Sequence, residues 1–211
     1  MKKYFAEFLG TFILIFCGTG AVVVNQLSNG AIGHIGIATT FGLIVMVIIY
    51  SLGAVSGAHI NPAVSIALAV ANKFEKKEVL PYIVSQVSGA LSASLTLKVM
   101  FPLATTLGAT LPAGSPMQSF VLEILLTFLL MFVIMNVTQG SKETSWLAGI
   151  IIGAMVLLEA LFAGPISGAS MNPARSIGPA VVSGNVADLW IYIAAPIVGA
   201  ILGVFAWKIL K

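Results

Sequence analysis

The stretch SGASMNPARSIGPA, residues 167–180, decides the fold of this chain, because an earlier stretch repeats it. Residues 56–69 read SGAHINPAVSIALA, and seven of the first ten positions are identical when Ser56 is aligned with Ser167. This fixed separation in sequence is called the repeat offset below. Each copy contains the triplet Asn-Pro-Ala. Internal similarity at one offset indicates that the chain consists of two related halves.

Each copy predicts the start of a short helix. Asn61 and Asn172 stand where a helix N-cap is favoured, and Pro62 and Pro173 follow at the first helical position, where a missing N–H needs no partner. The Ser- and Gly-containing residues before them predict non-helical backbone. At membrane depth such backbone is tolerated only inside protein or beside water, so the copies indicate a cavity. A capped helix of a soluble protein is the plainer alternative, and the long apolar runs around both copies argue against it.

The composition predicts an all-α integral membrane protein. Of 211 residues, 59% are hydrophobic and 8% charged, whereas soluble domains have about a quarter charged residues. A helix of about 20 apolar residues crosses the hydrocarbon core, and the two short helices, predicted at 62–72 and 173–183, cover about half of it. The six apolar runs long enough to span are 4–25, 34–54, 79–101, 118–138, 145–163 and 188–209. The predicted fold therefore has six transmembrane helices and two re-entrant half-helices.

The basic residues predict the orientation of these spans. Six spans place eight of the ten Lys and Arg residues on one side, which the positive-inside rule assigns to the cytoplasm together with both termini. The connections on the other side contain no Lys or Arg, and Lys98 at the end of the third span can snorkel. The first apolar run contains Glu7 and no small-residue cleavage site, so we expect it to stay in the mature protein. The eight basic residues are Lys2, Lys3, Lys73, Lys76, Lys77, Lys142, Lys208 and Lys211.

The repeat extends beyond the two copies. Glu7 and Thr11 in the first span recur as Glu123 and Thr127 in the fourth. Three spans per half invert the second half relative to the first, so both half-helices begin near the membrane centre. The predicted organisation is a first inverted repeat at 1–101, an extracellular linker at 102–117 and a second inverted repeat at 118–211.

The meeting of two helix N-termini predicts what the centre accepts. Each N-terminus carries about half a positive charge, so a cation or a relayed proton is repelled, whereas a neutral molecule with a hydrogen-bonding oxygen is not. Asn61 and Asn172 can cap the helix with the side-chain carbonyl and direct their NH2 groups into a pore. Capping without contact to the pore is the alternative.

One position where the halves differ carries a charge. Arg175 corresponds to Val64 at the repeat offset. An arginine at membrane depth costs about 2.5–3.5 kcal/mol on insertion scales, which favours a water-filled location. There it would bind solute oxygens and repel cations. Its alternative role is to hold loop carbonyls, and the two roles are compatible.

Most of the other ionisable residues predicted in or near the membrane have two possible roles each. Glu7 and Glu123 can accept hydrogen bonds from the N–H groups of the two non-helical segments, which we favour, or relay protons. Glu159 has no counterpart in the first half and either pairs with loop backbone or approaches the pore. His59 either lines the cytoplasmic mouth or is a loop histidine with satisfied partners. His34 is predicted to be an interfacial residue.

Little in the chain predicts an enzyme. The single cysteine, Cys17, excludes an intrachain disulfide and a cysteine-cluster metal site. Ser56 and Ser167 are one residue away from a G-x-S-x-G motif, and no His-Glu-x-x-His pair exists. We therefore expect no catalytic residue, no cofactor, no metal and no nucleic-acid partner, and we ascribe the net charge of +3 to membrane topology.

Two Asn-Pro-Ala copies in inverted halves, with Arg175 directly after the second, resemble the aquaporin or major intrinsic protein family over essentially the whole chain. The resemblance implies a homotetramer of right-handed six-span bundles in a lipid bilayer. Each protomer would have its own passive pore for water or small uncharged solutes. It also implies that Asn61 and Asn172 are the central donors, and Glu7 and Glu123 the carboxylates that hold the loops.

The family's selectivity filter combines one residue from the second span, one from the fifth, one from the second loop and the arginine. Counted without gaps from the motifs, these are Phe41, Ala160, Ala169 and Arg175. Strict water channels usually have His where this chain has Ala160, so the two alanines imply a wider, more apolar opening. Glycerol facilitators typically have Asp where this chain has Ser176, and they have longer loops.

Three stretches are similar to the nodulin-like intrinsic proteins of plants and their bacterial relatives. That subgroup implies water, glycerol and neutral metalloid hydroxides such as arsenous and boric acid as solutes. The extended plant termini are absent from this sequence, which favours a compact prokaryotic member in an inner membrane. The stretches are FGLIVMVIIYSLGAVSGAHINPAVS, SFVLEILLTFLLMFVI and FAGPISGASMNPARSIGPA.

The sequence thus predicts a passive channel for water and small uncharged solutes that excludes protons and ions. A water-selective channel is the first alternative. A proton-coupled transporter is a more remote one, because it would also have inverted repeats and buried carboxylates. The filter assignment depends on an ungapped register in the fifth span, where a shift of one residue would replace Ala160 with Glu159 or Leu161.

Overall fold

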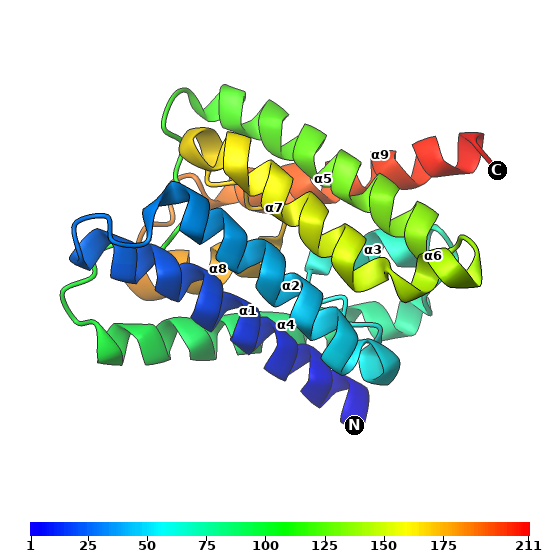
Figure 1. Ribbon diagram of the computed structural model, residues 1–211, viewed down its shortest axis with the longest axis horizontal. Helices are drawn as coiled ribbons and strands as arrows, with labels where there is room; N and C mark the ends of the chain where they lie inside the picture. Colours follow the sequence, from blue (N-terminus) through cyan, green and yellow to red (C-terminus); the bar gives the residue numbers. More distant parts are fainter.

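A computed structural model describes residues 1–211, apart from the side chain of Glu143. Within the described residues the chain is all helical, as predicted, and Figure 1 shows its helices as a bundle. Six of the helices are long and apolar enough to cross a membrane. In chain order, the helices are α1 Lys2–Leu27, α2 Gly33–Ser56, α3 Pro62–Val70, α4 Lys76–Met100, α5 Pro116–Thr138, α6 Lys142–Trp146, α7 Ala148–Ser167, α8 Pro173–Ser183 and α9 Leu189–Ile209.

The six spans α1, α2, α4, α5, α7 and α9 correspond to the six predicted apolar runs. The fifth differs in its bounds, because the prediction of 145–163 joined two separate elements. Ser141 caps the short helix α6 by accepting a hydrogen bond from the N–H of Thr144, and α7 begins only at Ala148. A helix of five residues has too few positions to show helical periodicity, so α6 was not predicted.

The half-helices α3 and α8 begin as their local sequence predicts. The side-chain carbonyl of Asn61 accepts from the N–H of Ala63, and that of Asn172 accepts from the corresponding N–H of Ala174. The helix α8 spans Pro173–Ser183. The helix α3 ends at Val70, slightly before the predicted bound, because Asn72 has a left-handed φ of 58° that stops the helix.

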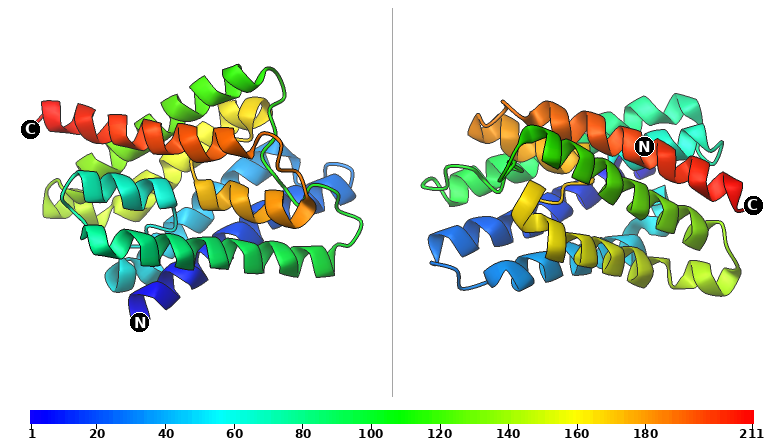
Figure 2. Two further views of the ribbon diagram at one scale, coloured as in Figure 1. Left: turned by 180° about the vertical axis from the view of Figure 1, so that it is seen from behind. Right: turned by 90° about the horizontal axis from the view of Figure 1, so that it is seen from above.

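Each half-helix packs mainly against the other half of the chain. Within each half the first and third spans pack together, α1 with α4 and α5 with α9, and α2 packs against α7 across the halves. Figure 2 (left) shows α3 and α8 roughly end to end between α4 and α9. Of these two, α3 packs mainly against α9 and α8 mainly against α4, so each half-helix rests mainly on the third span of the other half.

Glycines bring the first and third spans of each half into backbone contact. A Cβ atom added at Gly89 in α4 would lie 2.2 Å from the carbonyl oxygen of Phe8 in α1. Gly199 in α9 is the counterpart, where an added Cβ would lie 2.3 Å from the carbonyl oxygen of Ile124 in α5. At both crossings the helices therefore approach more closely than any other residue permits.

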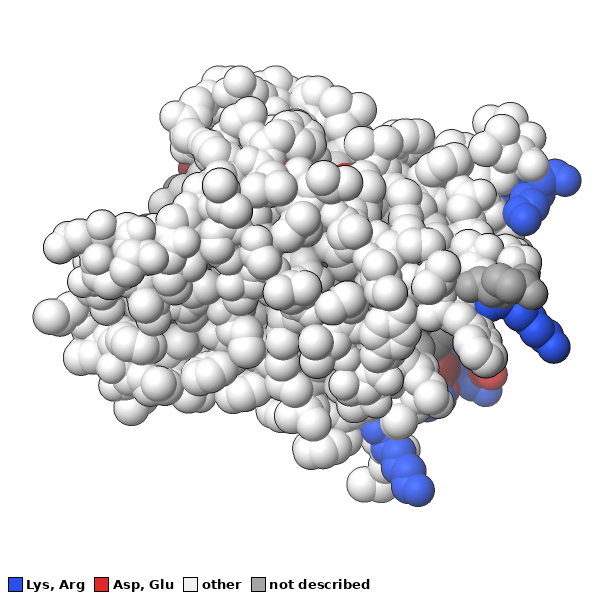
Figure 3. All heavy atoms as spheres, viewed as in Figure 1, with Lys and Arg blue, Asp and Glu red and all other residues white. Residues whose placement is uncertain are grey.

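Charged side chains gather at one end of the molecule. On the face shown in Figure 3, the visible lysine side chains and some of the acidic ones lie at the end that holds both chain termini in Figure 1, called the terminal end below. The opposite end is called the far end. Between them the flanks expose large apolar side chains such as Leu43 and Val47 of α2 and Leu125 of α5. This distribution suits a protein surrounded by lipid.

Candidate functional site

Two equivalent loops lead into the half-helices. Both α2 and α7 end at a glycine in the left-handed region, Gly57 and Gly168. In each loop two further residues have positive φ values of 43–53°, at positions that correspond at the repeat offset. Non-glycine residues rarely adopt this region, so both loops need strong support from their surroundings. The four residues are Ala58, Ile60, Ala169 and Met171.

Glu7 supports the first loop. One carboxylate oxygen accepts hydrogen bonds from the N–H of His59 at 2.9 Å and the hydroxyl of Ser56 at 2.7 Å. The other accepts from the N–H of Ile60 at 2.7 Å and the side-chain amide of Gln86 at 2.8 Å. The side chain of Glu7 is fully buried, so these four donors replace the water that a carboxylate requires.

Glu123 supports the second loop in the same way. It accepts from the N–H of Ser170 at 2.8 Å, the hydroxyl of Ser167 at 2.7 Å and the N–H of Met171 at 2.8 Å. The two backbone donors correspond to those of Glu7 at the repeat offset. These contacts favour a loop-supporting role over a proton relay, because every carboxylate oxygen of both residues accepts at least one hydrogen bond from a loop.

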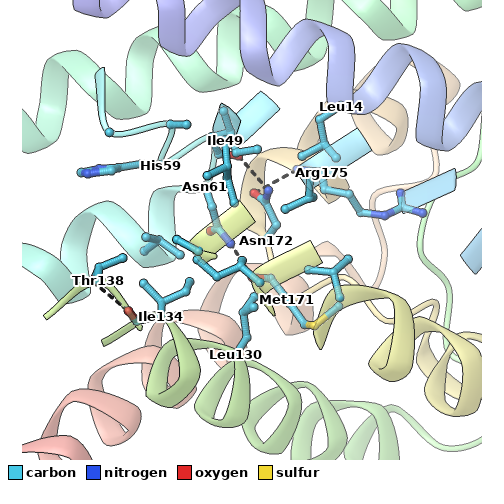
Figure 4. A pocket seen from close by; sticks show the side chains of 18 of the residues that line it. Leu14, Ile49, His59, Asn61, Leu130, Ile134, Thr138, Met171, Asn172 and Arg175 are labelled. Atoms are coloured by element: carbon cyan, nitrogen blue, oxygen red, sulfur yellow. Dashed lines mark hydrogen bonds between the residues drawn. The ribbon is translucent and has the colours of Figure 1, made fainter. Parts of the chain in front are cut away.

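Asn61 and Asn172 link the two loops reciprocally. The Nδ2 atom of Asn61 donates to the carbonyl oxygen of Met171 at 2.8 Å, and that of Asn172 donates to the carbonyl oxygen of Ile60 at 2.8 Å. Figure 4 shows the two side chains close together, between His59 on one side and Arg175 on the other. Because an amide group has two N–H bonds, each of these contacts uses one donor of an asparagine, whereas the sequence analysis predicted that both donors point into the pore.

A cavity of about 280 Å³ runs past both asparagines. Its walls are mainly apolar side chains of α2, α5 and α7, and the two loops supply most of its polar groups. Lys73 and Gln139 also line it, and Arg175 lines it on the opposite side of the asparagines from His59. Its apolar walls include Val45, Ile49, Leu130, Ile134, Ile152 and Val156.

The structure brings the four predicted filter residues to this cavity. Phe41, Ala160, Ala169 and Arg175 all line it, and the guanidinium carbon of Arg175 lies 5.0 Å from the centre of the Phe41 ring. That distance permits a cation–π contact. Glu159 is only 1% exposed and is not among the lining residues. The ungapped register in the fifth span therefore places the alanine, and not its acidic neighbour, at the cavity.

The linker between the halves holds the arginine. An N–H of the Arg175 guanidinium donates to the carbonyl oxygen of Gly108 at 2.8 Å. Gly108 has a φ of +72°, and an added Cβ would lie 2.8 Å from the side chain of Thr19. Thr110 continues the contact, since its hydroxyl lies 2.7 Å from that of Ser176 in α8. The sequence predicted no role for these linker residues, although a glycine such as Gly108 is typical of a backbone position with positive φ.

His59 lies on the terminal side of the asparagines. Its ring packs against Phe74 and Tyr82, with ring centres 4.7 and 5.1 Å away, and its Nδ1 lies 3.0 Å from the hydroxyl of Ser65. The residue lies outside the six spans, and burial lowers the pKa of its ring to about 4. The ring also lines the cavity.

Two lysines cap the half-helices across the repeat. The ammonium of Lys98 in α4 donates to the carbonyl oxygen of Val182 at the end of α8, at 3.0 Å. The ammonium of Lys208 in α9 lies 3.5 Å from the carbonyl oxygen of Val70 at the end of α3. Cations at helix C-termini are favourable, so each lysine stabilises the end of a half-helix that begins at one of the two asparagines.

The chain is similar to known proteins along its whole length. The sequence model described as "Major intrinsic protein" matches residues 1–207. "Aquaporin NIP1-3" of Oryza sativa subsp. japonica is 47% identical over 211 residues, covering 100% of this chain and 74% of the relative. "Probable aquaporin NIP4-2" of Arabidopsis thaliana is 49% identical over 211 residues, covering 100% of this chain and 75% of the relative.

A solved structure has the same arrangement of helices. The aquaglyceroporin from Plasmodium falciparum superimposes with a TM-score of 0.88 and 26% sequence identity, covering 99% of this chain and 96% of that one. The sequence relatives named above are plant proteins. The expectation of a prokaryotic source, which was drawn from the short termini, is therefore not borne out.

Proposed function

Since the chain belongs to the major intrinsic protein family of passive membrane channels, we propose that its cavity conducts water and small uncharged solutes. The solute class we propose includes glycerol-like polyols and neutral metalloid hydroxides such as arsenous and boric acid. The observation that carries this proposal is the composition of the filter, in which Ala160 and Ala169 are small and Arg175 supplies the charge. A passive channel needs no cofactor, and transport follows the solute gradient.

The cavity offers contacts to both the oxygen atoms and the carbon atoms of a polyol. Arg175, Asn61 and Asn172 offer N–H donors to the oxygens of a passing solute. Phe41 and the apolar side chains of α2, α5 and α7 contact its carbon atoms. A solute thereby replaces part of its hydration shell with protein donors while its apolar side stays out of water, which lowers the barrier to entry.

The charges around the cavity oppose cations. Both half-helices direct their N-termini at the asparagines, and Arg175 adds a full positive charge. No acidic side chain occurs among the described residues that line the cavity. A water molecule that accepts hydrogen bonds from Asn61 and Asn172 cannot also accept a relayed proton, so we expect protons to be excluded with other cations.

We further propose the assembly and the orientation that the sequence predicted. The protein would be a homotetramer whose protomers meet through apolar flanks and each contain a pore. The terminal end, where the basic side chains gather, would face the cytoplasm. In this arrangement the halves 1–101 and 118–211 are inverted about the membrane centre, and the linker 102–117 is extracellular.

Stopped-flow light scattering of proteoliposomes tests the solute range. We expect reswelling driven by glycerol and by arsenous acid to exceed that of empty liposomes. Ala160→His should lower the glycerol permeability about tenfold or more and leave the water permeability largely unchanged, because the larger polar ring narrows the filter. Ala148→His, at an alanine that lines the cavity near the terminal end, is the matched control and should keep the glycerol permeability.

The same measurement separates the proposal from its alternative. If the unmodified protein passes water and neither solute, the protein is a water-selective channel, and Phe41, Ala160 and Ala169 do not set its width. If Ala148→His abolishes glycerol flux as completely as Ala160→His, the constriction lies elsewhere in the cavity.

Arg175→Val tests the exclusion of cations. Valine is the residue that the first half has at this position, Val64, so the side chain is compatible with the start of a half-helix. We expect proton leakage, measured with a pH-sensitive dye in liposomes clamped by valinomycin and potassium, to rise several-fold, because a full positive charge leaves the filter. Arg175→Lys keeps the charge and should leak less. Equal leakage by the unmodified protein and Arg175→Val would mean that the half-helices alone exclude protons.

A further inference from the structure

A proline interrupts the hydrogen bonds of α7 beside the filter. Pro165 lies inside this helix, which continues to Ser167. Proline has no N–H, so the carbonyl oxygen of Leu161, one helical turn earlier, loses its usual partner within the helix. At the repeat offset the first half has Ala54 in place of Pro165, and alanine keeps the N–H. The missing hydrogen bond therefore occurs only in the half that supplies Ala160.

His34 supplies the missing donor. Its Nε2 atom lies 2.6 Å from the carbonyl oxygen of Leu161. A carbonyl oxygen can only accept, so the histidine carries a hydrogen on Nε2. The ring lies against Gly164, where an added Cβ would be 2.8 Å from the Cε1 atom of His34. The absence of a side chain at Gly164 thus makes room for the imidazole.

This hydrogen bond joins the two helices that carry the two filter side chains from the spans. His34 is in the first turn of α2, which carries Phe41 two turns later. Leu161 follows Ala160 directly in α7. The two helices also touch through Gly42 and Gly153, where an added Cβ on either would lie 2.7 Å from the carbonyl oxygen of the other. The His34 contact holds the same two helices, α2 and α7, together on the other side of the filter from these glycines.

We propose that His34 is a positioning residue of the selectivity filter. Its Nε2–H holds the last turns of α7 against α2 and thereby sets the separation between Phe41 and Ala160. The sequence alone predicted only an interfacial histidine at this position. This inference rests on the proposed function, because it assumes that these two residues limit the size of the solute.

A double-mutant cycle between His34 and Pro165 tests the proposal. The measured quantity is the ratio of glycerol to water permeability in proteoliposomes, normalised to the amount of inserted protein. His34→Ala should change this ratio by roughly two- to tenfold, the range that corresponds to one hydrogen bond. Pro165→Ala restores an N–H to α7, so adding His34→Ala to it should have no further effect. His34→Gln, whose side-chain amide can donate, should remain close to the unmodified protein.

Two results would overturn the proposal. One is an unchanged ratio in His34→Ala. The other is an equal effect of His34→Ala with and without Pro165→Ala, because the histidine would then act through something other than the Leu161 carbonyl.

Nitrogen-15 NMR of histidine-labelled protein tests the contact without any solute. The chain contains two histidines, so comparison with His34→Gln assigns the His34 signal. We expect a hydrogen on Nε2, and a hydrogen on Nδ1 alone would refute the contact. If the unmodified protein passes no glycerol, the proposed solute range fails, while the NMR result and the water permeability across the cycle still decide the role of His34.

Discussion

Glu123→Leu is expected to leave little folded protein in the membrane. The substitution removes the acceptor of three buried donors, the N–H groups of Ser170 and Met171 and the hydroxyl of Ser167. Each buried donor without a partner costs about 1–3 kcal/mol, and whole domains are stable by only about 5–15 kcal/mol. Size-exclusion chromatography of detergent extracts and thermal melting of the purified protein measure this loss.

Two other substitutions make the result interpretable. Glu75→Leu replaces a carboxylate whose side chain is 68% exposed and is paired with Lys77, and it should melt near the temperature of the unmodified protein. Glu123→Gln keeps one acceptor oxygen, so it should fold partly. The folded fraction of Glu123→Gln should conduct water normally. A folded Glu123→Gln protein that has lost transport, together with a dependence of transport on a pH gradient, would favour the proton-coupled alternative.

Gly89→Ala is expected to destabilise the protein by several kcal/mol. The added Cβ would meet the carbonyl oxygen of Phe8 at 2.2 Å and the backbone nitrogen of Phe12 at 3.1 Å, and backbone atoms cannot move aside as a flexible side chain can. The helices α1 and α4 would have to separate along their length, and overpacking of this kind costs about 1–3 kcal/mol or more. Thermal melting in detergent measures the effect.

The matched control is Gly53→Ala in α2, where the nearest atom to an added Cβ is 4.0 Å away. Alanine in an open helical position stabilises a helix by about 0.5–1 kcal/mol relative to glycine. We therefore expect opposite signs for the same chemical change. Equal melting temperatures of Gly89→Ala and Gly53→Ala would show that α1 and α4 can adapt to the additional methyl group.

The architecture could be predicted because its signals are local and repeated. Asparagine followed by proline starts a half-helix by capping and by a preset φ, which needs no knowledge of the rest of the fold. Apolar runs of sufficient length identify the six spans directly. The similarity of the first and fourth spans then paired Glu7 with Glu123, and the structure gives both carboxylates equivalent backbone partners.

The remaining parts of the site depend on contacts that no local pattern encodes. The hydrogen bond from Arg175 to Gly108 requires the linker to fold back into the bundle, and the linker has no helical or strand periodicity. The reciprocal bonds of the two asparagines depend on the distance between two loops that lie in different halves of the sequence. The sequence could not show whether Glu159 reaches the pore. A register shift of one residue in the fifth span would exchange Glu159 with Ala160, and only the packed structure fixes that register.

The packing of each half-helix against the other half has a consequence for biosynthesis. The helix α3 packs mainly against α9, and Lys208 of α9 reaches its last turn. The ribosome makes α9 after the other eight helices described here, so α3 lacks its main packing partner while those helices are made. Asn61 likewise cannot donate to the carbonyl oxygen of Met171 until that part of the second half has been made. The loop before α3 can already have its Glu7 contacts within the first half, but a chain that stops before α9 lacks the surface on which α3 mainly packs.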